Sequence, residues 1–128
     1  MSPARQMERA TTQGVSGAPL IGTWNNVDKS TKDLVRLVIT AQPTGVSVNP
    51  FGACTPSPCN WGVEPATLYA SSVDAGLAVA FTALFNLGFA NVIVTGNLRQ
   101  NELLVKTFTK FTDASGRSSY YTAATMMK

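Results

Sequence analysis

The chain has 128 residues, the size of one domain, and 45% of them are hydrophobic, which is enough for a core. Only 13% are charged, about half the usual share, which is typical of an all-β protein or of one that buries surface in an assembly. The net charge is +3 and the basic residues are scattered, so we expect no nucleic-acid partner. The chain has no histidine, so we expect no enzyme activity, no metal and no cofactor.

Residues 1–18 are polar, rich in Gly, Ser, Thr and Gln, and have no hydrophobic periodicity. They predict a flexible N-terminal arm, either disordered or packed on a neighbouring subunit. In the given sequence, this segment lacks the apolar core that a signal peptide would have. No apolar run approaches the ~20 residues of a membrane helix, so we expect no membrane span.

From residue 19 onward, apolar residues alternate with polar ones, and turn signals recur every ~10 to 15 residues. The segment 77–85 has the alanine content of a helix, but its alternation favours a strand. In the second segment, Val35, Leu37 and Ile39 form the more apolar face. The pattern predicts eight strands, at residues 20–27, 34–40, 46–51, 66–71, 77–85, 89–98, 102–111 and 118–126.

Eight antiparallel strands close naturally into a barrel, because closure removes exposed strand edges. We therefore predict an all-β fold, an eight-stranded antiparallel up-and-down β-barrel over residues 19–128. Alternating connections would place every second loop on one shared rim. The loops expected there are 28–33, 52–65, 86–88 and 112–117.

The segment "GTWNNVDKS", residues 22–30, resembles the first strand of the calycin superfamily, which includes lipocalins and avidins, and the avidin branch most closely. The resemblance implies that Trp24 closes the base of the barrel, and it leaves open whether Trp24 also touches a ligand. It implies that Asn26 and Ser30 occupy positions that bind the ureido oxygen of biotin in avidins. It also implies a late basic residue across the tryptophan, Arg117 or Lys128, of which we favour Arg117.

The segment "FGACTPSPCNWG", residues 51–62, holds the two cysteines, Cys54 and Cys59. A zinc site would need two further ligands, and a redox pair prefers two intervening residues, so a disulfide fits best. The bond would hold Asn60 and Trp61 in a long rim loop and would favour a secreted or cell-surface protein. The alternative is two free thiols, which would favour the cytoplasm.

Two functions remain open. The first is a binding module in which the cysteine loop captures a small molecule or carbohydrate, with Trp24, Asn26, Ser30, Asn60, Trp61, Arg117 and Tyr120 as candidate ligand-binding residues. The second is a structural or assembly protein with a filled barrel. Both faces of several strands are apolar, so we expect a homo-oligomer in either case.

Overall fold

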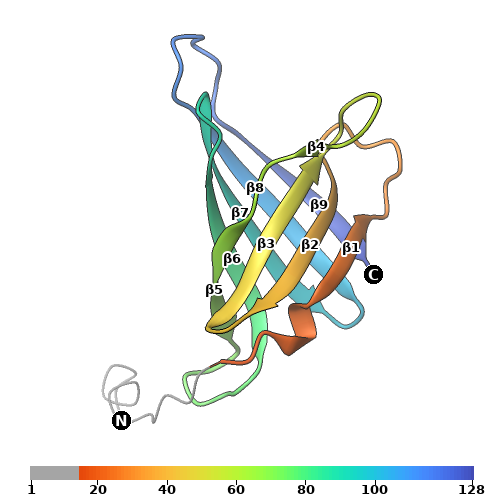
Figure 1. Cartoon of the computed structure of the whole chain (residues 1–128), viewed down its shortest axis with the longest axis vertical. Helices are drawn as coiled ribbons and strands as arrows, with labels where there is room; N and C mark the ends of the chain where they lie inside the picture. Colours follow the sequence, from red (N-terminus) through yellow and green to blue (C-terminus); the bar gives the residue numbers. More distant parts are fainter. Residues whose placement is uncertain (1–14) are drawn as a thin grey trace.

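The computed structural model describes residues 15–128, which form a closed antiparallel β-barrel (Figure 1). The predicted all-β fold and its eight barrel strands are confirmed. Within these residues, no helix has the length and apolar character required to cross a membrane. The barrel strands are β1 Gly22–Asn26, β2 Leu34–Gln42, β3 Gly45–Gly52, β5 Glu64–Ala70, β6 Ala78–Asn86, β7 Ala90–Arg99, β8 Glu102–Phe111 and β9 Tyr120–Met127.

Two short elements complete the chain order. The 3-10 helix η1, Ala18–Leu20, precedes β1, and the two-residue strand β4, Cys59–Asn60, lies between β3 and β5. Each barrel strand pairs with its successor in the ring, and the β1–β9 and β2–β3 pairings close it. The segment 78–86 is a strand, as its alternation predicted, because its alternate residues are buried in the barrel.

The strand β2 contains a bulge that the sequence pattern did not predict. The pairing with β3 shifts between Leu34 and Arg36, and Leu34 is buried while Val35 is only half-buried. A bulge adds one residue to a strand and reverses the alternation beyond it. The more apolar face of Val35, Leu37 and Ile39 in the sequence therefore does not continue as one buried face, and Leu34 rather than Val35 is buried with Leu37 and Ile39.

The lower half of the barrel in Figure 1, which lies toward η1 and the β2–β3 turn, is filled by side chains. Inward residues alternate along β7 and β8, as at Val94 and Val105, and their side chains are almost fully buried. The ring of Phe81 lies over Gly96, where an added Cβ would meet a ring carbon at 2.1 Å. This glycine is needed because the aromatic ring occupies the space of a side chain. The lower half is thus a packed core.

The floor of the barrel is built around Trp24, whose exposed fraction is 2%. Its indole Nε1 donates a hydrogen bond to the carbonyl oxygen of Leu20 at 2.8 Å, and Lys128 Nζ lies 5.0 Å from the ring centroid. The choice of Arg117 for this contact is therefore wrong. The glycine of the Gly-x-Trp spacing is explained by its backbone, because Gly22 has a φ of 141°, a conformation that other residues rarely adopt.

Residues 15–18, the last part of the predicted N-terminal arm, are held on the barrel. Residues 1–14 of the arm lie outside the described part of the chain. Residues 15–18 are not free, because Ser16 forms a parallel bridge with Leu77. The amide of Ser16 donates to the carbonyl of Gly76 at 2.8 Å, and the amide of Ala78 donates to the carbonyl of Ser16 at 2.8 Å. This segment crosses the floor and belongs to the barrel.

Candidate functional site

The upper end of the barrel, here called the mouth, holds a cavity of about 440 Å³. The connections β1–β2, β3–β5, β6–β7 and β8–β9 gather at this end (Figure 1), as the alternation of loops predicted. A cavity of this size is within the range of small-molecule sites. The barrel is therefore packed at its floor and hollow at its mouth.

One wall of the mouth is completed by the connection between β3 and β5, residues 53–63, here called the Cys-loop. The strands β3 and β5 pair only where the first half of β3 meets the start of β5, through Ser47 with Pro65 and Val48 with Glu64. Above that point β4 replaces β5 as the partner of β3. The Cys-loop thus fills a seam in the barrel wall that the strands leave open.

Trp61 directly follows β4 and contacts the inside of the mouth. Its amide donates to the carbonyl of Pro50 at 3.0 Å, and its ring meets Phe85 edge-on, with centroids 6.3 Å apart. Gly52 gives the indole room, because an added Cβ would lie 3.0 Å from Nε1. Trp61 and the neighbouring Asn60 both line the cavity.

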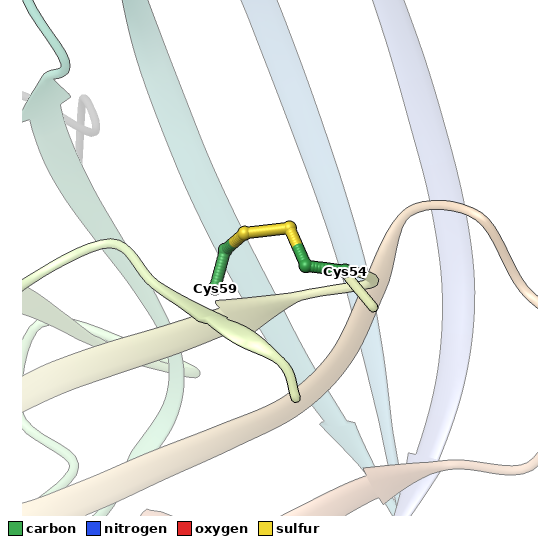
Figure 2. Close-up of a disulfide and its surroundings, with 2 residues drawn as sticks. All are labelled: Cys54 and Cys59. Carbon is green, nitrogen blue, oxygen red and sulfur yellow. A yellow bond between two sulfur atoms is a disulfide. The ribbon is translucent and has the colours of Figure 1, made fainter. Parts of the chain in front are cut away.

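A disulfide joins Cys54 to Cys59 across the Cys-loop (Figure 2). The predicted bond is confirmed, and the alternative of two free thiols is wrong. The two Cα atoms are 5.5 Å apart, and both residues line the mouth cavity. The bond therefore fixes the start of β4 and, through it, the position of the tryptophan two residues later.

Threonines form the polar part of the cavity wall. Thr107 and Thr122 face each other on β8 and β9, with their hydroxyl oxygens hydrogen-bonded at 2.6 Å, and Thr109 lies above them. Inward positions of β8 hold Leu103 and Val105 near the floor and threonines near the mouth. The alternation of residues 102–111 is consistent with inward positions for Thr107 and Thr109, but a local pattern does not show that they line a cavity.

Tyr120 lies on the inner side of β9 at the rim, where it lines the cavity. Its ring stacks on Phe111, with centroids 6.0 Å apart. Arg117 lies 4.0 Å from the centre of the same Phe111 ring and pairs with Asp113 at 2.8 Å. Hydrogen bonds from the Ser115 side chain and amide, and then the Arg117 guanidinium, lower the pKa of Asp113. Arg117 thus orders the rim loop and does not line the cavity.

Asn26 and Ser30 do not line the mouth cavity. The Asn26 side chain donates to the carbonyl of Leu34 at 2.9 Å and accepts from the amide of Asp28 at 2.8 Å. The Ser30 hydroxyl donates to the Asp28 carboxylate at 2.8 Å, and the bonds from Ser30 lower the pKa of Asp28. These polar groups close the β1–β2 loop, and the structure does not bring them together with Trp61 and Tyr120.

The charged lining residues are Lys32 and Asp33, both at the rim. Within residues 15–128, no three His, Cys, Asp or Glu side chains gather closely enough to hold a metal ion. Apart from Asn60 and the disulfide, the remaining lining is aromatic, aliphatic and hydroxylic, and it includes Leu34, Leu87 and Phe89, which sequence reasoning did not select. Leu87 and Phe89 lie in a turn, where no periodicity in the sequence indicates which way a side chain points.

Comparison of the chain with protein-family models, curated proteins and solved structures finds no match. The closed eight-stranded antiparallel barrel is consistent with a calycin-like barrel in general.

Proposed function

We propose that the chain is a non-enzymatic binding module that captures a small molecule or carbohydrate at the Cys-loop rim. The observation that carries the proposal is the cavity of about 440 Å³ above a filled floor. Ligand sites are typically preformed hollows with a mainly apolar wall and a few placed polar groups. The mouth has this composition.

The wall chemistry favours an uncharged ligand with a ring or other flat apolar face. Trp61, Phe89 and Tyr120 supply aromatic surface, and the paired hydroxyls of Thr107 and Thr122 supply polar contacts. A charged ligand would lose its hydration without a buried partner of opposite charge, which is costly. A sugar ring or a small aromatic alcohol would use both parts of this wall.

A calycin-like identity in the wider sense is part of this proposal. The buried Trp24 beside Lys128 supports it, because the resemblance implied a late basic residue across this tryptophan. The avidin-like detail has less support, since Asn26 and Ser30 are hydrogen-bonded within the β1–β2 loop. The alternative of a purely structural barrel predicts a filled interior, which suits the floor and not the mouth.

A secreted or cell-surface location is also part of the proposal. The Cys54–Cys59 disulfide supports it, because such bonds persist in oxidising compartments and are rare in the cytosol.

The test uses the uncharged fluorescent probe N-phenyl-1-naphthylamine, followed by competition with neutral sugars and aromatic alcohols. The variant Thr122→Phe places a ring in the cavity, and its control Thr23→Phe adds the same ring to the exposed outer face of β1. We expect one probe per wild-type chain and displacement by at least one neutral competitor. Thr122→Phe should weaken probe binding at least ~10-fold, about 1.4 kcal/mol, while Thr23→Phe should leave it unchanged.

Circular dichroism checks that both variants are folded. If folded Thr122→Phe protein binds the probe as tightly as the wild type, the mouth is not the site. If no neutral compound displaces the probe, the proposed ligand class is wrong.

A further inference from the structure

The outer wall carries a continuous row of exposed apolar side chains, here called the apolar row. It runs across four neighbouring strands, from β6 to β9, because each member pairs in register with the next. The four side chains of the row, taken from β6 to β9, have exposed fractions of 67%, 42%, 45% and 65%, and the first two are aliphatic and the last two aromatic. The members, in order, are Leu84, Ile93, Phe108 and Tyr121.

The aromatic end of the row borders a hollow. Phe108 and Tyr121 stack with ring centroids 6.1 Å apart, and together with Ile93 they line an open groove of about 490 Å³ on the outer wall. Leu84, at the other end, is the most exposed of the large hydrophobic residues in the described part of the chain. The row thus has a protruding aliphatic end and a grooved aromatic end.

We propose that the apolar row is the contact surface of a symmetric dimer of this chain. A two-fold axis along the strands, between β7 and β8, would place Ile93 of each copy against Phe108 of the other. The same axis places the protruding Leu84 of one copy against the groove at Tyr121 of the second copy. The row is therefore complementary to itself, as an isologous contact requires.

The charges beside the row agree with this symmetry. Lys106 and Lys110 flank Phe108 on β8, and their register partners on β7 are Thr95 and Asn91. The proposed axis places each lysine against the neutral threonine or asparagine of the other copy. Like charges therefore do not meet, and the contact has an apolar centre with a polar rim.

The area indicates a dimer of moderate strength. An aromatic side chain has a surface of about 150–250 Å². The exposed fractions of the four side chains in the apolar row therefore correspond to apolar surface on the order of 400 Å² per copy. The flanking polar rows extend the contact toward the roughly 600 Å² per copy at the low end of stable interfaces. We therefore expect a dissociation constant on the order of micromolar.

Sedimentation velocity from about 1 to 200 µM, a range chosen around that constant, tests the dimer. We expect the wild type to pass from monomer to dimer. Ile93→Lys should weaken association at least ~100-fold, because it desolvates a charge at the centre. The control Val27→Lys adds the same charge at an exposed apolar residue of the β1–β2 loop and should leave association unchanged. A wild type that stays monomeric, or an equally strong Ile93→Lys dimer, would overturn the proposal.

Disulfide trapping tests the register of the dimer. Leu84→Cys and Tyr121→Cys are made in separate chains and then mixed under mild oxidation, while the native cysteines remain bonded to each other. The proposed axis predicts rapid cross-links when the two variants are mixed, because the new cysteine on β6 of one copy would face the new cysteine on β9 of the other. Each variant alone should form no cross-link, because in a dimer of one variant the two new cysteines would lie three strand spacings apart, ~14 Å. Homodimers of Leu84→Cys would place the axis elsewhere and contradict the proposal.

Discussion

Replacement of Trp24 tests the floor of the barrel. The side chain is almost fully buried, and an aromatic side chain of ~150–250 Å² contributes about 4–6 kcal/mol at 25 cal/mol per Å², an upper bound. Trp24→Ala also leaves the carbonyl of Leu20 without its indole donor. We expect a loss of ~3–5 kcal/mol in the free energy of unfolding, as large aromatic truncations in cores produce.

Trp24→Phe separates packing from hydrogen bonding. Phenylalanine keeps most of the apolar contact but has no N–H group, so the loss should be ~1–3 kcal/mol, the cost of an unsatisfied buried acceptor. Guanidinium chloride unfolding followed by far-ultraviolet circular dichroism measures both variants without relying on indole fluorescence. A loss below ~1 kcal/mol for Trp24→Ala would refute the reasoning, because it would place the tryptophan outside the core.

Two further perturbations act on the rim. Replacing Cys54 and Cys59 together with serine should cost ~2 kcal/mol, as the chain-entropy relation gives for so short a loop, and thiol titration of the denatured, unreduced wild type should find no free thiol. The pKa of Asp113 is lowered, so its bonds to Ser115 and Arg117 should persist at neutral pH and be lost only as the pH falls through the lowered pKa, below the usual 3.8. Amide hydrogen exchange in the rim loop of the wild type should rise at that pH. An Asp113→Asn chain should show no such step.

The strands could be predicted because their physical cause is local. A half-buried strand must alternate, and Leu103, Val105 and Thr107 do so without interruption, which is why 102–111 has the same limits in the prediction and in the structure. The β2 bulge escaped prediction because the extra residue is defined by its partner strand. β4 escaped because two residues are too few to show a period.

The site could be predicted only in part. Cys54, Cys59 and Trp61 stood out because their residue types are rare in this chain. The position of Lys128 over Trp24 depends on where the C-terminus meets the floor, which no local pattern reveals. Asn26 was selected by resemblance, but its hydrogen bonds depend on the fold of the β1–β2 loop.

The division of the barrel into a filled floor and a hollow mouth has an evolutionary consequence. Truncating a side chain in the floor costs ~2–5 kcal/mol, while changes away from packed contacts usually cost within ~0.5 kcal/mol. Mouth positions such as Asn60 and Phe89 line the cavity and are exposed, so their exchange puts little of the folding energy at risk. Descendants of this chain could therefore vary the lining of the mouth one substitution at a time, without first acquiring a more stable scaffold.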